Sequence, residues 1–273
     1  MPSAHTHFLR TVCSYYRQHG RHDLPWRQAA PDGSFDSYNI LLSEVMLQQT
    51  QVPRVIPKFT AFLQQFPDFA SLARASLGSV LVAWQGLGYN RRAKYLWQAA
   101  QMVMEEYGGT LPQTAEDLAR LPGIGANTAG AIMAYAYNEP AIFIETNIRT
   151  VFIHHFFQEQ AGVPDAAIRE LLEQTVDHHN PRTFYWALMD YGTHLKQVVG
   201  NISRASKTYT KQPRFSGSLR QLRGRALQLL AAGSMPASRL LCELNDPRAA
   251  QVLHDLGREH MVQQEGDEYH MPH

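Results

Sequence analysis

Glu145 is an isolated acid at the end of an apolar run. It follows Ala141-Ile142-Phe143-Ile144 and precedes Thr146-Asn147. A carboxylate in this position could be half of an active site. It could also be an ordinary helix-start residue, and Arg149, four residues further on, could pair with it on a helix surface.

Glu44 is a second acid among apolar neighbours. It lies in the segment "NILLSEVMLQQ", and Gln48 follows it by one helical turn. Burial raises the pKa of a carboxyl group, so that the group can keep a proton near neutral pH and donate it. The ordinary alternatives are a helix-surface residue, a cap, or a polar contact between helices.

The segment "LPGIG", residues 121–125, separates two helical patterns. Pro122 stiffens the start of the turn, and the two glycines allow a tight connection. Backbone N–H groups at the start of the next helix then form a nest that can bind a phosphate without reading sequence. A plain helix–helix turn is the alternative for so short a segment.

A basic stretch lies late in the chain and contains no acid between Lys196 and Arg225. The whole chain carries a net charge of +1, so the remainder carries −7. Such a stretch is either a phosphate-binding surface or a solvated linker. Its basic residues are Lys196, Arg204, Lys207, Lys211, Arg214, Arg220, Arg223 and Arg225.

The elements that must position these groups are helical almost throughout. Apolar residues recur at helical spacing, and no strong alternating strand pattern appears before residue 200, which predicts an all-α fold. Helices are expected, among other places, over residues 37–52, 147–157, 165–178 and 182–198.

The C-terminal part differs from the rest. Three helical segments are followed by two short β-prone pieces around a turn at "EGDE". That order is typical of a winged-helix module, whose third helix, about Pro247–Leu256, would be the one offered to a DNA groove. The alternative is a helical tail that binds nothing.

Composition and length narrow the function classes. The 273 residues contain 44% hydrophobic residues, enough for more than one lobe. No apolar run could span a membrane, and the N-terminus lacks the pattern of a secretory signal. Only Cys13 and Cys242 occur, too few for a disulfide framework or a four-thiolate cluster. We therefore expect a cytoplasmic monomer, associated with the nucleoid if bacterial.

Six motifs lie in order along the chain: "LPWR" (24–27), "LLSEVMLQQTQV" (41–52), "WQGLGYNRRAKYL" (84–96), "LPGIGANTAGAI" (121–132), "IETNIRTV" (144–151) and "MDYGT" (189–193). In this order and approximate spacing they resemble the MutY-type adenine DNA glycosylases of the helix–hairpin–helix (endonuclease III-like) superfamily. The resemblance covers about residues 8–200.

The resemblance implies a two-lobed helix–hairpin–helix fold with duplex DNA and the extruded base held between the lobes. The expected core is 1–200, with a six-helix lobe at about 30–140 and a second lobe from 1–29 plus 141–200. A basic linker at 201–217 and a C-terminal helical module at 218–273 follow.

The resemblance also implies roles for single residues. Glu44 matches the general acid that protonates the base. Glu145 matches an aspartate that stabilises the cation formed as the base leaves, and Asn147 would orient it by hydrogen bonding. Base-pocket residues are Trp26, Arg27, Asp190 and Asn127. DNA-contacting residues are Gln48 and Gln49 at the gap left by the base, the wedge Tyr89, the hairpin residues Leu121, Gly123, Gly125 and Thr128, and the basic residues Arg214, Arg220 and Arg223.

Asn127 bears on the type of reaction. It occupies the position where bifunctional relatives carry a lysine, and an amide cannot form a Schiff base. A monofunctional enzyme without lyase activity is therefore expected. The adjacent histidine pairs at 154–155 and 178–179 do not predict a metal site, because neighbouring side chains point apart on a helix.

The chain departs from the family in three places. The four cysteines that usually follow the "MDYGT" segment are missing, so an iron–sulfur cluster is predicted to be absent, and the basic stretch is expected to present cationic side chains to the DNA backbone instead. About 60 residues remain where the lesion-reading MutT-like domain would need well over 100. Glutamate replaces aspartate at 145. The hairpin at 121–125 stays a candidate site for a monovalent cation.

These observations favour a monofunctional DNA glycosylase that hydrolyses the N-glycosidic bond of a mispaired base, most readily adenine, for base-excision repair. One alternative is the same fold acting on uracil or thymine opposite guanine, or on a deaminated purine. Another is a mismatch- or lesion-binding protein with little catalysis, which would follow from the change to Glu145.

Overall fold

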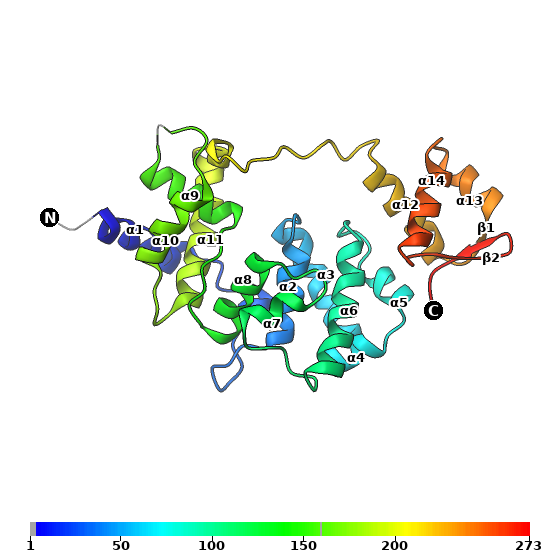
Figure 1. Ribbon diagram of the computed structural model, residues 1–273, viewed down its shortest axis with the longest axis horizontal. Coiled ribbons are helices and arrows are strands. Elements are labelled where there is room, and N and C mark those ends of the chain that lie inside the picture. The colour runs from blue at the N-terminus through cyan, green and yellow to red at the C-terminus, as the bar shows by residue number, and fades with distance from the viewer. Residues whose placement is uncertain (1–3, 159) are drawn as a thin grey trace. The chain divides into compact units, whose positions relative to one another are not determined.

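The computed structural model describes residues 4–158 and 160–273, and most of them are helical (Figure 1). The chain forms two compact units. The first comprises Met1–Glu44, Gln113–Arg120 and Ile124–Lys211, and the second comprises Val45–Pro112, Leu121–Gly123 and Gln212–His273. The predicted domains are continuous ranges of the sequence, whereas these units are defined by spatial contacts and combine separate ranges. The predicted domain boundaries therefore stay a prediction.

The first unit is built around one long helix. Helix α11 (Pro181–Val198) packs along α9 (Thr146–Phe156) and also against α1 and α8. Gly192 permits the close approach to α9, because a Cβ atom there would lie 2.6 Å from the carbonyl oxygen of Asn147. The other elements of this unit are α1 (Ala4–His19), a 3₁₀ turn η1 (Pro25–Arg27), most of α2 (Ser37–Leu47), α7 (Ala115–Arg120), α8 (Ala126–Tyr137), α10 (Asp165–Thr175) and η2 (Ile202–Ala205).

Local sequence explains where the site-bearing helices begin. The Asp36 carboxylate accepts from the backbone N–H of Tyr38 at 2.8 Å, which caps α2 and sets the position of Glu44 along it. Pro181 occupies the first turn of α11, where its missing N–H costs nothing. Helices predicted at 147–157, 165–178 and 182–198 are present as α9, α10 and α11.

The second unit has its own apolar core. Helix α6 (Arg91–Glu106) packs against α4 (Phe69–Arg74) and α5 (Leu77–Ala83). Phe59, Phe62 and Trp84 are among the largest fully buried side chains of the described residues. The remaining elements are the end of α2, α3 (Val52–Gln65), α12 (Leu219–Ala231), α13 (Ala237–Leu244), α14 (Ala249–Arg258), and the strands β1 (Met235–Pro236), β2 (Gln263–Glu265) and β3 (Glu268–His270).

The C-terminal elements have the order of a winged helix. They run α12, β1, α13, α14, β2 and β3, and the three strands pair antiparallel in the order β1-β3-β2. The sequence predicted the hairpin but not β1, because a two-residue strand has no alternating pattern to detect. The module is part of the second unit: Gly78 on α5 donates its N–H to Pro272 at 3.0 Å, and Gln85 donates to Leu227 at 3.4 Å.

Within residues 4–158 and 160–273, no helix combines the length and the hydropathy that a membrane crossing requires.

Candidate active site

The two predicted acids come together in the first unit. Glu44 lies in the last turns of α2, and Glu145 is the residue that precedes the first turn of α9. Burial raises the pKa of Glu44 well above its ordinary value, the charge of Glu145 raises it further, and Arg27 opposes both. Both side chains keep some accessible surface although protein atoms enclose them. They are therefore largely enclosed residues and not helix-surface groups.

The electrostatics divide the two acids. Burial also raises the pKa of Glu145, but Arg149 and Lys196 lower it. The charges of Arg149 and Lys196 favour the ionised form of Glu145, whereas the charge of Glu145 disfavours ionisation of Glu44, so a single proton shared by the pair is favoured on Glu44. An acid and a carboxylate in one pocket are what a proton-assisted bond cleavage with a developing cation requires.

Arg149 does not make the helix-surface pair with Glu145 that was the ordinary alternative. Its guanidinium forms two hydrogen bonds to the Asp165 carboxylate, at 2.8 and 2.7 Å. Its influence on Glu145 is therefore through space. The helix dipole of α9 adds partial positive charge at the same end and also favours an anion at position 145.

Asp190, a predicted base-pocket residue, is occupied by two arginines. Arg27 donates to both of its oxygens, at 2.8 and 3.0 Å, and Arg21 donates through its backbone N–H at 2.8 Å and through its guanidinium. Burial alone would raise the pKa of Asp190, but the hydrogen bonds and charge of Arg27, with those of Arg21, hold it below its ordinary value. Asp190 thus fixes Arg27, whose charge acts on Glu44.

An aromatic wall continues the site from Arg27. The guanidinium carbon of Arg27 lies 5.1 Å from the ring centroid of Trp186, and Trp186 stacks on Tyr135 with a centroid distance of 5.9 Å. Tyr135 is buried, and the charges of Glu44 and Glu145 contribute to the raised pKa of its phenol after burial itself. Trp26 is buried in the same unit. Sequence reasoning missed Tyr135 and Trp186, because both lie at ordinary core positions of their helices.

Asn147 differs from its expected role. Its amide oxygen accepts from the Lys196 ammonium at 2.5 Å, and its amide nitrogen lies 3.9 Å from the sulfur of Met189. Among the described residues it forms no hydrogen bond to Glu145, so the expected direct orientation of that carboxylate is not present. The sequence placed Lys196 only in the basic stretch and gave no signal of this contact, since it depends on how α11 lies against α9.

Asn127 has a supporting position. It is exposed near the start of α8, its amide nitrogen donates to the carbonyl of Ile144 at 3.3 Å, and its amide oxygen accepts from the Ile144 N–H at 3.3 Å. Asn127 therefore holds the backbone one residue before Glu145. The sequence supplied its inability to form a Schiff base, and its place in the base pocket stays a prediction.

The hairpin at 121–125 connects α7 and α8 as predicted. Leu121 and Ile124 are buried, so both side chains belong to the core. Gly123 has φ = +77°, and a Cβ atom there would lie 2.8 Å from Cβ of Tyr95. Thr128 is half-buried in the first turn of α8, and Gly125 is exposed. A role of these residues in phosphate binding stays a prediction.

The predicted wedge residues lie together in the second unit. Gln49 and Tyr89 both have left-handed backbone, with φ of 57° and 49°, which is uncommon outside glycine. Gln212 donates to the Tyr89 hydroxyl at 2.6 Å and also hydrogen-bonds the side chain of Gln49. The backbone carbonyl of Gln48 accepts from the buried guanidinium of Arg92.

Arg92 ties the two strained turns together. Its guanidinium donates to backbone carbonyls of both, including Gln48 at 2.7 Å and Gly88 at 3.0 Å, and to Thr50 Oγ1 at 3.0 Å. Burial lowers the pKa of Arg92 to about 10, so it stays charged at neutral pH. Arg92 is buried, and its side chain points inward and not toward solvent.

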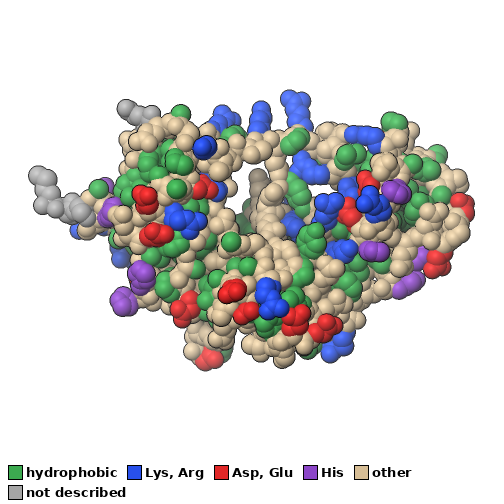
Figure 2. All heavy atoms as spheres, in the orientation of Figure 1, with side chains coloured by type: hydrophobic (Ala, Val, Ile, Leu, Met, Phe, Trp, Pro, Cys, Tyr) green, Lys and Arg blue, Asp and Glu red, His purple; other side chains and the backbone are tan. Residues whose placement is uncertain are grey.

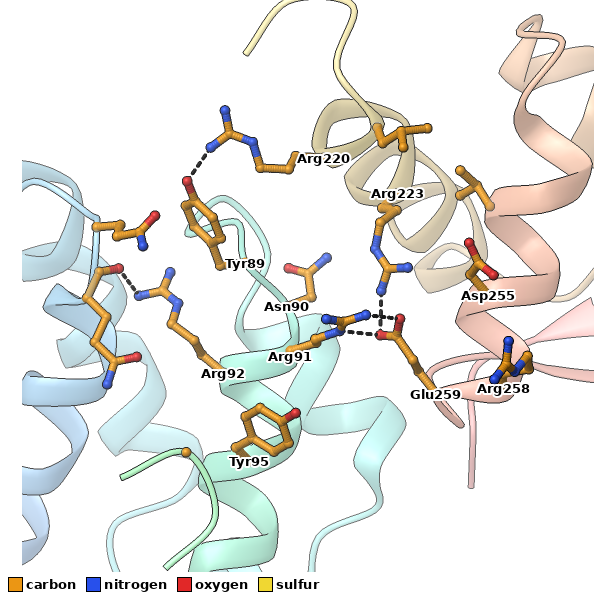
Figure 3. Close-up of a pocket in the computed structure, with 15 residues that line it drawn as sticks. Tyr89, Asn90, Arg91, Arg92, Tyr95, Arg220, Arg223, Asp255, Arg258 and Glu259 are labelled. Carbon is orange, nitrogen blue, oxygen red and sulfur yellow. Dashed lines mark hydrogen bonds and ion pairs between the residues drawn. The ribbon is translucent and has the colours of Figure 1, made fainter. Parts of the chain in front are cut away.

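A cavity of about 830 Å³ opens beside the wedge (Figure 3). Arg220 points at the Tyr89 hydroxyl, while Arg91 and Arg223 converge on the Glu259 carboxylate, with contacts of 2.6 Å each. Lys and Arg side chains gather on the face over α6 and α12 (Figure 2). Arg214 is exposed in the segment before α12. The basic side chains that line this cavity come mainly from α6 and α12, and α14, the helix predicted to enter a groove, contributes Arg258.

The residues after α11 do not fit an iron–sulfur cluster. The chain has only Cys13 and Cys242, and no group of three or more His, Cys, Asp or Glu side chains among the described residues could hold a metal ion. Ser203 and Ser206 are buried there, and Ser203 donates to Asn201 at 2.5 Å. Backbone bonds of 2.9 and 3.0 Å join this segment to Val163. A monovalent cation at 121–125 stays a prediction.

The chain is similar to known DNA repair proteins. The family model described as "HhH-GPD superfamily base excision DNA repair protein" matches residues 42–177. Proteins named adenine DNA glycosylase are similar: one from Buchnera aphidicola subsp. Baizongia pistaciae is 33% identical, over 68% of this chain and 52% of its own length. One from Mycolicibacterium smegmatis is 32% identical, over 94% of this chain and 92% of its own. One from Homo sapiens is 39% identical over 68% of this chain and 35% of its own.

Solved structures give the same fold. A thermostable thymine-DNA glycosylase superposes with a TM-score of 0.59 and 25% identity, over 69% of this chain and 86% of that one. A trapped endonuclease III–DNA covalent intermediate superposes with a TM-score of 0.57 and 15% identity, over 71% and 88%. The chain spans about half the length of the Buchnera relative and nearly all of the mycobacterial one.

Proposed function

The chain belongs to the MutY-type branch of the HhH-GPD superfamily of base-excision DNA repair proteins, and from that premise we propose that it is a monofunctional DNA N-glycosylase that removes mispaired adenine from duplex DNA. One observation carries the proposal: Glu44 and Glu145 lie together in the first unit, where the charge of Glu145 raises the pKa of Glu44 while Arg149 and Lys196 lower the pKa of Glu145.

The chemistry uses these two states directly. Glu44 gives its proton to the departing base, the N-glycosidic bond breaks, and the bonding electron pair leaves with the base. The sugar is left as an oxocarbenium-like cation, which the Glu145 carboxylate stabilises. Water then adds to C1′ and loses a proton, which leaves an abasic site in an uncut strand.

Other groups hold this pair in position. Asp190 fixes Arg27 beside Glu44, and Asn127 holds the backbone before Glu145. Tyr135 and Trp186 form a buried aromatic layer that packs against Arg27. The name carried by the relatives supports adenine as the excised base.

The proposed partner is duplex DNA that contains a mismatch or a damaged base. The protein would bind it as a monomer, and in a bacterium it would do so at the nucleoid. Tyr89 and Gln49 would fill the gap left by the base, in the manner of an aromatic wedge. The exposed basic residues near α12 would contact phosphates.

Absence of lyase activity is part of the proposal, because position 127 holds an amide. Lys196 is an amine on the Glu145 side of the site, but its ammonium donates to Asn147 and feels the charge of Glu145. Borohydride reduction during turnover should trap no covalent adduct. An adduct that disappears in Lys196→Met would contradict the monofunctional assignment.

Two alternative functions can be tested. The structural similarity to a thymine-DNA glycosylase favours a pyrimidine opposite guanine as the substrate. The glutamate at position 145 favours a DNA-binding protein with little catalytic activity. Single-turnover assays at high enzyme concentration should show release of adenine opposite G or 8-oxoguanine, and not of U or T opposite G or of hypoxanthine. Binding without release on every duplex would make the chain a binding protein.

Glu44→Gln gives a sharper test with two readouts. Adenine release should fall by at least about a hundredfold, because no proton is available, while duplex binding persists. The raised pKa of Glu44 also means that wild-type stability falls as pH rises through that pKa. The melting temperature of Glu44→Gln should therefore exceed that of the wild type by more at higher pH. Unchanged activity would remove Glu44 from the mechanism.

A further inference from the structure

Glu259 is held by cations from two other helices of the second unit (Figure 3). Arg91, at the start of α6, donates to both of its carboxylate oxygens, at 2.9 and 2.6 Å, and Arg223 on α12 donates to one of them at 2.6 Å. The ammonium of Lys94 donates to the backbone carbonyl of Glu259 at 2.5 Å. The hydrogen bonds and charge of Arg91, with those of Arg223, lower the pKa of Glu259 to about 2 against the effect of burial.

The helix that carries Glu259 does not favour a carboxylate at this position. Glu259 directly follows the last residue of α14 and caps its C-terminal end. That end of a helix carries partial negative charge, which stabilises cations and not anions. The carboxylate is therefore stabilised by the arginines of α6 and α12, and these arginines define an anion-binding position.

This anion-binding position belongs to a cavity with an excess of positive charge. Five arginines and two carboxylates line the cavity of about 830 Å³, which leaves its lining with a net charge of +3. Tyr89, the predicted wedge, lines the same cavity. A cavity of this composition attracts polyanions. The charged lining residues are Arg91, Arg92, Arg220, Arg223, Arg258, Asp255 and Glu259.

We propose that Arg91 and Arg223 form a binding site for a backbone phosphate of duplex DNA, which Glu259 occupies in the free protein and leaves when DNA binds. The inference rests on the proposed function, because it takes duplex DNA as the ligand. A phosphate presents its oxygens to an arginine fork in the same bidentate manner as a carboxylate does. Ion pairs between partly exposed side chains are weak, so one anion can replace the other.

This exchange gives the C-terminal module a role in DNA binding. Arg223 and Glu259 lie outside residues 42–177, the part of the chain that the family model matches, whereas Arg91 lies inside it. The module thus supplies one arginine of the phosphate site and also the carboxylate that competes for it. Because phosphates carry no sequence information, the competition lowers affinity for all duplexes alike.

Glu259→Gln removes the competing charge and keeps the length of the side chain. Fluorescence anisotropy should show that the variant binds duplex DNA roughly fivefold more tightly than the wild type, because no ion pair has to be broken first. Asp255→Asn is the matched control: Asp255 lies on α14 and lines the same cavity, but its described contacts are with Gln251 and His254. Equal tightening in both variants would show a general effect of charge and overturn the proposal.

A double-mutant cycle with Arg223→Met locates the effect. Arg223→Met by itself should weaken binding to duplex DNA, because one of the two guanidiniums is lost. In the Arg223→Met background, most of the gain from Glu259→Gln should disappear, since both residues act on the same phosphate. Strictly additive effects of the two substitutions would contradict a shared site.

Inorganic phosphate probes the anion-binding position without DNA. Glu259→Gln leaves the arginines unpaired, so phosphate should raise its melting temperature by more than that of the wild type or of Asp255→Asn. Each protein is compared with itself, so the measurement holds even if Glu259→Gln folds less stably. Equal shifts in all three proteins would overturn the anion site.

Stabilisation of Glu259→Gln by phosphate, with unchanged affinity for duplex DNA, would show a site for free phosphate and contradict the proposal. Failure of the proposed function has a different signature. In that case wild-type protein releases no adenine from any duplex, whatever Glu259→Gln does to binding.

Discussion

At the scale of single residues, Glu145 is a charged group whose neighbours compensate its burial. Lys196 and Arg149 both lower its pKa against the effect of burial, and Lys196 is held in place by Asn147. The site therefore contains Lys196 as a cation, Glu145 as a carboxylate and Glu44 as an acid. The resemblance to the family predicted Glu145 and Glu44, whereas Lys196 was found through its contact with Asn147.

Glu145→Asp tests whether this pocket is built for the longer acid. Shortening the side chain withdraws the carboxylate by about one carbon–carbon bond, and an error of about 1 Å in placement can cost roughly a hundredfold in rate. We expect single-turnover adenine release to fall by about that factor. Glu145→Gln, which keeps the length and removes the charge, is the control. A faster rate in Glu145→Asp would instead show that the glutamate supports the reaction less well than an aspartate at the same position.

Lys196→Met should change the pH dependence. The active pair has Glu145 ionised and Glu44 protonated, so the rate falls on the acid side as Glu145 gains a proton and on the alkaline side as Glu44 loses one. Without the Lys196 charge the pKa of Glu145 rises, and the acid limb moves to higher pH. Lys207→Met, an exposed lysine of the same basic stretch, should leave the profile unchanged. A uniform loss of rate without movement of the limb would limit Lys196 to a structural role.

At the scale of secondary-structure elements, short connections do most of the positioning. The turn after α2 and the loop before α6 are both held by the Arg92 guanidinium. Gly123 has a backbone conformation and a contact with Tyr95 that exclude a side chain. These turns and the Gly123 hairpin all lie at helix ends, where backbone N–H and C=O groups lack partners within the helix.

Arg92→Lys should destabilise the fold by about 2 kcal/mol or more, because several buried carbonyls lose their donor and one ammonium cannot reach them all. Urea unfolding measures this loss. Arg91→Lys is a close control, since Arg91 is the exposed neighbour whose ion pair with Glu259 contributes about 1 kcal/mol or less. Similar small losses in both variants would show that the Arg92 network does not fix the two turns.

At the scale of the whole molecule, the basic stretch divides between the two units. Lys196 belongs to the chemistry of the first unit, and Arg223 is neutralised by Glu259 in the second. Exposed Lys211 and Arg214 remain available for phosphates. The C-terminal module is packed on α5 through Gly78 and Pro272. Removing it would expose that face, so charge substitution tests DNA contact more cleanly than truncation does.

Binding to duplex DNA should weaken with salt, with log Kd linear in log salt concentration. Lys211→Ala and Arg214→Ala should each reduce the slope by about 1 if each contacts one phosphate. Arg239→Ala, an exposed arginine on α13, should leave the slope unchanged. Slopes equal to that of the wild type in all three variants would place the phosphate contacts elsewhere.

The sequence by itself determined the helical class and the positions of most main helices, and it pointed to the two acids, whose catalytic roles stay a prediction. Helical periodicity and capping residues are local properties, and Glu44 and Glu145 stand out because they interrupt apolar runs. The order of helices and hairpin at the C-terminus could also be predicted, whereas β1 could not, since its two residues are strand only through pairing with β3.

Tertiary structure alone decided what each polar group binds. Arg92 and Lys196 look like surface charges in the sequence, yet one is buried between two turns and the other reaches Asn147 across two helices. Arg149 pairs with Asp165 and not with Glu145. These outcomes depend on side-chain direction and helix packing between positions distant in the chain. Spacing along one helix does not specify them, because it fixes neighbours only within that helix.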